Sequence, residues 1–253
     1  MTSSLDDRSC KRCRRQFPSK TSLERHQCGV GFTCQFCKIT LSTEKYLFNH
    51  LCDLKRRFLQ RDDKSTKVAF AAYERFYVRS MNRRKPITYD EFDRSPFYAA
   101  FIRFARHLID LGAISPMQFV DFLLRVEAPI DRWTDPVMYA TYIRELNKNE
   151  SPADAVERNL MVMEQWSIES GEDWRDFFRK VAPALATGWI RSGKISPWLL
   201  CTASSAWILM DRLSEEQICI VNEAIDADYW QAKISRHQET VEAIRNTLSE
   251  NGI

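Results

Sequence analysis

Long hydrophobic runs are missing from this chain of 253 residues. A membrane-spanning helix needs roughly 18 or more consecutive apolar residues, and no such stretch occurs. The opening segment MTSSLDDRSCKRCRR also lacks the apolar centre of a secretory signal peptide. We therefore expect no membrane partner and a cytoplasmic protein.

Glycine is scarce beyond residue 65. Only Gly112, Gly171 and Gly188 lie inside that part of the chain, away from its apparent helix ends. So few glycines leave little room for the tight turns of a sheet protein. Apolar residues instead recur at helical spacing, as at Phe97 and Phe101. The sequence predicts a mainly α protein whose larger part is an all-α, multi-helix globular domain.

Proline after a capping residue marks where several helices should begin. The N–H groups of the first turn have no partner within the helix, so proline, which has no N–H, costs no hydrogen bond there. The capping pairs are Ser95-Pro96, Ser115-Pro116, Asp135-Pro136, Ser151-Pro152 and Ser196-Pro197. The expected helices span residues 66–82, 96–111, 116–126, 136–147, 152–169, 172–191, 197–211, 214–225 and 236–250.

Common catalytic signatures are also absent. The chain has no phosphate loop, dinucleotide glycine pattern, nucleophile elbow, HExxH motif or deaminase arrangement. The sequence therefore does not favour a familiar hydrolase or nucleotide-fold enzyme.

Cysteine, in contrast, is concentrated near the N-terminus, where six of the eight fall before residue 53. One set of four residues recurs 24 positions later: Cys10, Cys13, His26 and Cys28 are followed by Cys34, Cys37, His50 and Cys52. Paired CxxC motifs with a nearby His indicate metal in a reducing compartment. We predict two structural zinc ions, and we expect Cys201 and Cys219 to be ordinary core residues.

Each repeat resembles the two-Cys two-His zinc finger as far as its first His. The resemblance implies a hairpin that bears both Cys, a helix that bears the His, and Phe17 or Leu41 packed on Leu23 or Leu47 beneath the metal. The last ligand departs from that family, since it is a Cys two residues after the His. Positions i and i+2 of a helix point about 200° apart. The helix must therefore break at the His, and for the second repeat this means between His50 and Cys52.

The charge is unevenly distributed. Residues 1–64 hold 14 Lys and Arg against seven Asp and Glu, so this part carries a charge of about +7. The remainder carries about −4, and the two parts sum to the net charge of +3. We divide the chain into tandem fingers over residues 1–54, a basic helical connector over 55–85 and an all-α domain over 86–253. A basic module on an acidic body suggests DNA as partner, although solvated charge is the alternative.

Several finger residues are candidates for nucleic-acid contact. By position in the resembling family, Arg25 and Asn49 would face bases, as readers of guanine and adenine. Six other basic residues are suited to phosphate: Arg14, Arg15, Lys45, Lys55, Arg56 and Arg57. Fingers that bind protein, or only stabilise a terminus, are the alternative.

Charged residues form a stripe on the expected helix 96–111. Arg103, Arg106, His107 and Asp110 recur at intervals of three and four. We take them, with Arg191, as candidate catalytic residues, because His107 is the best available proton carrier of the body. Further cations that could hold an anionic group are Arg144, Arg158 and Lys194. A solvated helix face is the alternative.

Two other patterns stand out in the body. The spacing of Ile, Gly, Ile, Ser and Pro over residues 109–116 recurs at 190–197, which a shared loop solution explains without duplication. Most tryptophans are expected in the core, with Trp189 and Trp198 as the candidate exceptions that could stack on a base.

The body also resembles a group of small helical proteins encoded by phages. The resemblance is carried by RKPITYDEFDRSPFYAAFIRFARHLIDLGAISP, TYIRELNKNESPADAVER and GWIRSGKISPW. Some of that group, the glutamyl or putrescinyl thymine pyrophosphorylases, are amino-acid:DNA transferases. The resemblance implies that an amine or amino acid displaces pyrophosphate from a modified 5-hydroxymethyl-uracil in phage DNA, within the host cytoplasm. The alternative is a non-enzymatic regulator or adaptor, on which the arginines would scatter instead of converging on one pocket.

Overall fold

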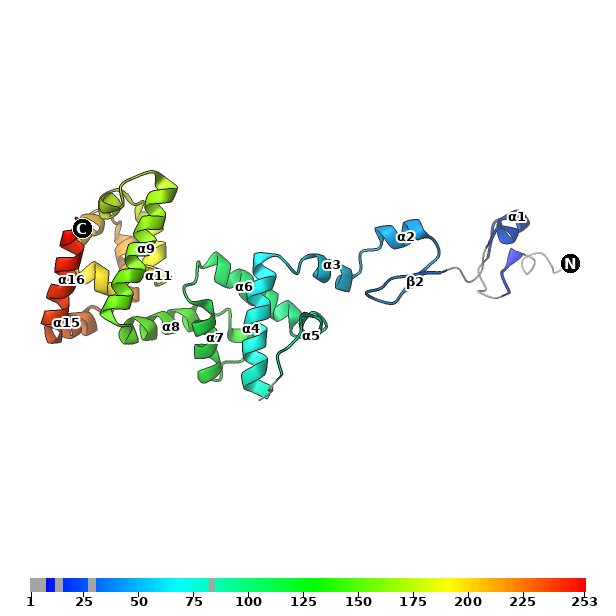
Figure 1. Ribbon diagram of the computed structural model, residues 1–253, viewed down its shortest axis with the longest axis horizontal. Helices are drawn as coiled ribbons and strands as arrows, with labels where there is room; N and C mark the ends of the chain where they lie inside the picture. The colour runs from blue at the N-terminus through cyan, green and yellow to red at the C-terminus, as the bar shows by residue number, and fades with distance from the viewer. Residues whose placement is uncertain (1–7, 12–15, 27–30, 82–84) are drawn as a thin grey trace. The chain divides into compact units, whose positions relative to one another are not determined.

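The chain folds as two compact units, Met1–Asp63 and Lys64–Ile253, which we call the finger unit and the helical unit (Figure 1). The computed structural model describes residues 8–11, 16–26, 31–81 and 85–253. Among these residues the only sheet has two strands, so the prediction of small fingers followed by an all-α domain is confirmed. The expected connector 55–85 falls on both sides of the boundary between the units.

The finger unit consists of two short motifs in sequence. In the first, Ser9 bridges Gln16 in antiparallel fashion, and α1 (Lys20–Glu24) follows. In the second, β1 (Phe32–Thr33) pairs with β2 (Thr40–Leu41), with Phe32 opposite Leu41. Two helices follow this hairpin, α2 (Glu44–Asn49) and α3 (Asp53–Leu59).

The helical unit contains two hydrophobic cores. The elements around the first are α4 (Lys64–Met81), α5 (Tyr89–Asp93), α6 (Tyr98–Asp110), α7 (Pro116–Arg125), η2 (Ile130–Arg132) and α8 (Pro136–Asn149). Those around the second are α9 (Pro152–Ser170), η3 (Trp174–Asp176), α10 (Phe177–Lys180), α11 (Pro183–Arg191), α12 (Pro197–Thr202), α13 (Ala206–Met210), α14 (Glu215–Ala224), α15 (Ala227–Arg236) and α16 (Gln238–Glu250).

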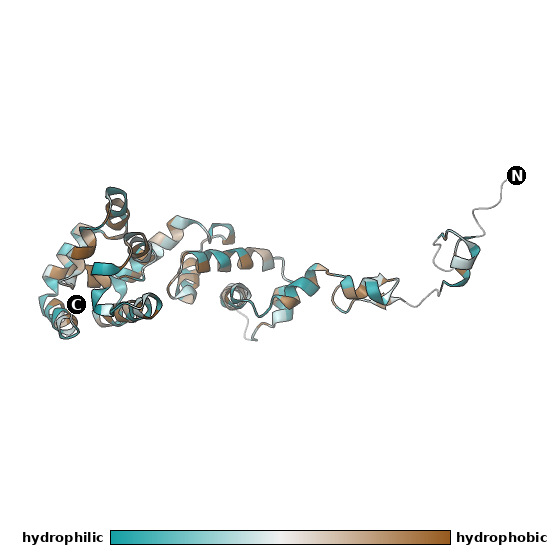
Figure 2. Cartoon of the chain, turned by 90° about the horizontal axis from the view of Figure 1, so that it is seen from above, coloured by the Kyte–Doolittle hydropathy of each residue, from teal (hydrophilic) through white to brown (hydrophobic). Residues whose placement is uncertain are grey.

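Aromatic side chains dominate the first core. α4 packs on α6 and α7, and the ring of Phe101 meets those of Tyr73, Phe76 and Trp133 at centroid distances of 5.3 to 5.5 Å. Edge-to-face and tilted pairs of this kind stabilise a core beyond the area that they bury. The second core gathers Trp166, Phe177 and Trp198 with many aliphatic side chains. Figure 2 shows helices of this unit with one hydrophobic and one hydrophilic side.

The predicted helix starts are confirmed at four of five positions. Proline occupies the first turn of α7, α8, α9 and α12, and the side chains of Asp135, Ser151 and Ser196 accept a backbone hydrogen bond as N-caps. The exception is Ser95, since α6 begins only at Tyr98. The Ser95 hydroxyl instead accepts a hydrogen bond from the Phe97 N–H at 3.0 Å.

Two expected helices are wrong as single elements. The span 172–191 is divided into η3, α10 and α11, because Pro183 has no N–H to donate and holds Ala182 in an extended conformation. The span 197–211 is interrupted at Ala203, whose backbone is extended (ψ 126°). Helices α5 and α15 were not expected, although Thr88 and Asp226 cap them.

Three burial predictions are also wrong. Cys201 and Cys219 are exposed, because they lie on the outer sides of α12 and α14, away from the core positions Leu199 and Val221. Trp198, expected as a stacking exception, is only 1% exposed and belongs to the second core.

Among the described residues, no helix is both long and apolar enough to span a bilayer.

Candidate metal centre and charged pocket

The second finger places its two CxxC cysteines at the tip of the hairpin. The Cys34 N–H donates to the Ile39 carbonyl, and the Lys38 N–H donates to the Cys34 carbonyl, both at 2.9 Å. Lys38 adopts a left-handed conformation (φ 62°), which reverses the chain directly after Cys37. This tight turn holds the side chains of Cys34 and Cys37 on the same side of the hairpin, in reach of one metal ion.

The remaining two ligands lie where one helix ends and the next begins. Thr43 caps the start of α2, which ends at Asn49, and the backbone of His50 is extended (φ −72°, ψ 116°). Cys52 is itself the N-cap of α3, and its sulfur accepts a hydrogen bond from the Lys55 N–H at 3.4 Å. The predicted break between His50 and Cys52 is confirmed, and it turns both ligands toward the hairpin.

The four side chains form a compact ligand group. The sulfurs of Cys34 and Cys52 are 4.0 Å apart, and the Cys37 sulfur is 3.2 Å from Nε2 of His50. All four ligand atoms lie within 4.8 Å of one another. A tetrahedral zinc with bonds of about 2.0 to 2.3 Å separates its ligand atoms by about 3.5 to 3.8 Å. The group fits one zinc ion.

Local hydrogen bonding favours the thiolate at one of these ligands, Cys34. The backbone N–H of Cys37 is the main cause that lowers the pKa of the Cys34 thiol to about 7, although burial opposes the shift. A thiol with a lowered pKa supplies more of the thiolate that binds zinc. The ring of Phe58 on α3 packs against Phe36 of the hairpin at 5.2 Å, which holds α3 on the metal-binding turn.

Only part of the first finger is described. Its His26 follows α1, and the ring of Phe17 lies 4.7 Å from the imidazole. Ser19 caps α1 by accepting a hydrogen bond from the Ser22 N–H at 3.1 Å. Cys10 lies in the described part, whereas the predicted ligands Cys13 and Cys28 lie outside the described residues.

The comparison with protein families identifies this first motif. Residues 8–29 match the zinc finger of C2H2 type. No curated protein and no solved structure matches the chain. The family match thus covers the first finger, while the complete ligand group is seen in the second, and the repeat of 24 residues relates the two.

The candidate nucleic-acid residues of the second finger fall into two groups. Lys45 and Asn49 are exposed on α2, and no hydrogen bond or ion pair with the described residues holds either side chain. Two candidates on α3 are engaged within the unit: Lys55 donates to the Phe48 carbonyl at 3.3 Å, and Arg56 pairs with Asp53.

The other nucleic-acid candidates are distributed as follows. Arg57 on α3 is half-buried. In the first finger Arg25 is exposed directly after α1. Arg14 and Arg15 lie outside the described residues. The exposed residues Arg25, Lys45 and Asn49 therefore offer the most accessible contacts.

The charged stripe of α6 is on the outer side of the helical unit. Arg103, Arg106 and Asp110 are exposed, opposite the buried Phe101 and Phe104. His107 is half-buried, and its Nε2 has no hydrogen-bond partner among the described residues. Burial lowers the pKa of His107, with a smaller opposing effect from Asp110, so the neutral imidazole is favoured.

Two of the candidate catalytic residues line one pocket. The cavity has a volume of about 950 Å³ and is bounded by the end of α6, by α8, α11 and α14, and by the loop after α11. Its charged walls are Asp110, Arg144, Arg191, Lys194 and Glu223. Arg103, Arg106 and His107 do not line it.

Glu223 was not anticipated from the sequence, because the spacing within α14 does not show which side of that helix faces α11. Trp189, the second candidate stacking residue, does line the cavity. One face of its ring stacks on Phe177 at 6.0 Å, and the Lys194 ammonium lies 5.7 Å from its centroid.

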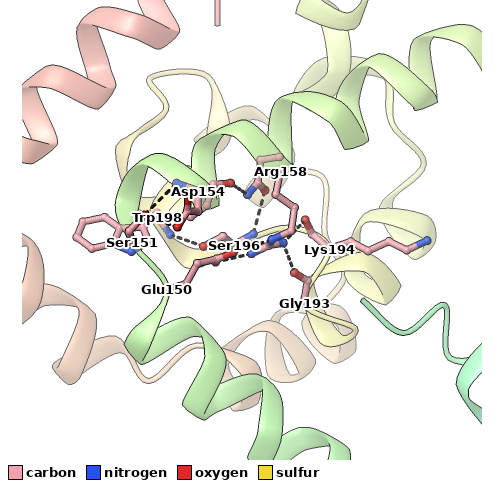
Figure 3. A network of polar contacts seen from close by, with 10 residues as sticks. Glu150, Ser151, Asp154, Arg158, Gly193, Lys194, Ser196 and Trp198 are labelled. Atoms are coloured by element: carbon pink, nitrogen blue, oxygen red, sulfur yellow. Dashed lines mark hydrogen bonds and ion pairs between the residues drawn. The ribbon is translucent and has the colours of Figure 1, made fainter. Parts of the chain in front are cut away.

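Arg158, a cation considered for anion binding, has a structural position instead (Figure 3). Its guanidinium donates to both carboxylate oxygens of Glu150, at 2.9 and 2.6 Å. It also donates to the carbonyls of Gly193 and Lys194. Asn159, which lies beside Arg158 on α9, accepts a hydrogen bond from the Ser196 N–H at 2.9 Å. These contacts fix the loop after α11, which carries Lys194 of the pocket.

Proposed function

We propose that this chain is a DNA-binding protein whose tandem zinc fingers hold the duplex. The ligand group Cys34, Cys37, His50 and Cys52 supports this proposal most directly, because a bound metal would fix α2 on its hairpin. The family matched by residues 8–29 supports it as well, because zinc fingers of this type place a helix in the major groove.

The exposed side of α2 supplies the contacts. Lys45 and Asn49 are four residues apart, so they lie on one face of the helix. Among the described residues, their side chains form no hydrogen bond or ion pair that DNA would have to displace. An ammonium group neutralises phosphate without reading sequence, whereas an amide donates to and accepts from adenine. Lys45 therefore contributes affinity and Asn49 contributes preference among sequences.

Substitution of these two residues separates the roles. We expect Lys45→Ala to weaken duplex binding and to reduce the slope of log affinity against log salt by about one. Asn49→Ala should flatten the preference among sequences and leave that slope unchanged. Fluorescence anisotropy of labelled duplexes at several salt concentrations measures both effects, and Lys67→Ala, an exposed lysine on α4, is the matched control.

Residues 64–253 alone should lose most of the affinity. Equal binding by this fragment and by the whole chain would show that the fingers are not the DNA-holding element.

The finer proposal is that the helical unit transfers an amine or amino acid to phage DNA. The observation that favours it is the pocket, where Arg144, Arg191 and Lys194 could hold a pyrophosphate leaving group. In the reaction the amine nitrogen bonds to the methylene carbon on C5 of the uracil. The bond from that carbon to the pyrophosphate oxygen breaks, its electron pair leaves with pyrophosphate, and the nitrogen loses a proton. Asp110 belongs to the charged stripe of α6 and also lines the pocket, so its carboxylate could accept that proton.

The test uses DNA that carries pyrophosphorylated 5-hydroxymethyl-uracil, a mixture of amino acids and polyamines, and mass spectrometry of the released nucleosides. We expect transfer by the intact protein, a loss of at least about tenfold in Arg191→Ala and Asp110→Asn, and no change in Arg179→Ala, an exposed arginine on α10. Absence of transfer by the intact protein would favour the adaptor.

A further inference from the structure

The two loops with the shared Ile, Gly, Ile, Ser and Pro spacing come together in the helical unit. Tyr139 of α8 joins them, since its hydroxyl accepts a hydrogen bond from the Ile114 N–H at 3.2 Å and donates to the Ser192 carbonyl at 2.9 Å. A Cβ on Gly193 would lie 3.2 Å from the Ile114 side chain and 2.7 Å from that of Ile143. The similar segments 109–116 and 190–197 therefore pack together on α8.

Both loops turn at a glycine in the left-handed region, with φ of 59° at Gly112 and 80° at Gly193. Other residues rarely adopt this conformation. A Cβ on Gly112 would lie 3.2 Å from the Lys194 ammonium. Because Gly112 has no side chain, the loop 109–116 leaves room for the Lys194 ammonium of the loop 190–197. The charged pocket opens where these two loops meet.

The charges of this pocket are not neutralised by one another. Three cations and two carboxylates line it, yet no ion pair within 4.0 Å joins any of them to the described residues. The contrast with Arg158 is direct, because that guanidinium is fully engaged by Glu150 and two carbonyls. Lys194 itself extends away from the Arg158 cluster (Figure 3). The Arg144 Nε donates to the Ala140 carbonyl at 3.4 Å, and the Lys194 ammonium lies over the Trp189 ring. No carboxylate of the described residues pairs with Arg144, Arg191 or Lys194, so their charge is available to an incoming anion.

The arrangement selects a class of ligand. Two guanidinium forks and an ammonium match a phosphate group, which takes several charge-assisted hydrogen bonds at once. The volume of about 950 Å³ far exceeds one phosphate, and apolar side chains such as Ile109, Ile143 and Leu185 line the rest. Asp110 and Glu223 accept hydrogen bonds from hydroxyl or amino groups. We propose that this pocket binds a small organic phosphate with hydroxyl groups, either a nucleotide or a sugar phosphate.

This proposal uses the same pocket cations as the proposed transfer reaction, and the site is separate from the proposed DNA contact of the fingers. Because binding is measured without DNA and without turnover, a failure to bind is distinguishable from a failure to transfer. Calorimetry on the full zinc-loaded chain would use thymidine 5′-monophosphate, ribose 5-phosphate, inorganic phosphate and thymidine as probes. We expect at least one organic phosphate to bind, and thymidine to bind at least about tenfold more weakly, because it lacks the charged group. Binding by both phosphates indicates sugar phosphate recognition, and binding by the nucleotide alone indicates base recognition.

Variants locate the site. Arg191→Ala and Lys194→Gln should each reduce affinity by about tenfold or more, because each removes a charge-assisted hydrogen bond. Both side chains face the pocket and not a core, so circular dichroism should show unchanged folding, and Arg245→Ala on α16 is an exposed control. The proposal fails if no organic phosphate binds, if thymidine binds as well as its phosphate, or if the pocket variants bind as the control does.

Discussion

Replacing Arg158 by Ala should lower the free energy of unfolding of the helical unit by about 3 to 5 kcal/mol. The Arg158 and Glu150 side chains are only 20% and 10% exposed, so water screens their ion pair poorly. Removal of the guanidinium leaves the Glu150 carboxylate and the carbonyls of Gly193 and Lys194 without their donor. Each unsatisfied group adds a desolvation penalty. Urea unfolding followed by tryptophan fluorescence measures the change, because all seven tryptophans lie in this unit.

An exposed ion pair provides the matched control. Lys180 contacts Glu172 at 2.6 Å and Asp176 at 3.1 Å, but its side chain is 42% exposed. Lys180→Ala should therefore cost less than about 1 kcal/mol. Similar losses in the two variants would show that the Arg158 cluster does not brace the loop. Arg158→Ala should also weaken ligand binding at the pocket, since it frees the backbone that carries Lys194.

The finger geometry could be predicted because it depends on local rules. Four ligands at one repeated spacing indicate zinc, and the angular step of a helix requires a break between His50 and Cys52. The structure shows how the chain makes that break: α2 ends at Asn49 and Cys52 starts α3 as its N-cap. No sequence rule foretold that the ligand would also be a capping residue.

The helical body was predictable in class and less so in its boundaries. Pro183 is a clear stop signal that the helical periodicity of residues 172–191 obscured. The interruption at Ala203 has no comparable signal, since neither proline nor glycine lies nearby. There the Ser204 hydroxyl donates to the Ile253 carbonyl at 3.4 Å, a contact from the far end of the unit. Packing between distant segments is not visible in a short window.

The same limit applies to the charged residues. Arg103 and Arg191 look alike in sequence, but only Arg191 lines the pocket. The pocket that Arg191 lines forms where two loops 81 residues apart pack together, and Arg158 holds the second loop at Gly193, 35 residues further along the chain. Helical spacing shows which residues share a face of one helix. It does not show which helices meet at that face.

Removal of zinc should unfold the finger unit and leave the helical unit intact. A module of about 24 residues buries too little apolar surface to fold alone, and structural zinc contributes roughly 10 kcal/mol or more to such modules. The second finger has such a small core, because its large side chains Tyr46, Phe48 and Leu51 are more than 60% exposed. A chelator should therefore expose the finger unit to protease. Tryptophan fluorescence should not change, since the finger unit contains no tryptophan.

Metal analysis of purified protein should find two zinc ions per chain. The first site is proposed because Cys10, Cys13, His26 and Cys28 repeat the ligand set of the second finger, and because residues 8–29 match a zinc-finger family. Cys34→Ser and Cys10→Ser should each leave one ion, and the double variant none, whereas the exposed Cys201→Ser should keep both. Thiolate ligands must lose their protons, so zinc should be released as the pH falls. One ion in the intact chain, unaffected by Cys10→Ser, would restrict zinc to the second finger and remove the repeat as a guide to the first.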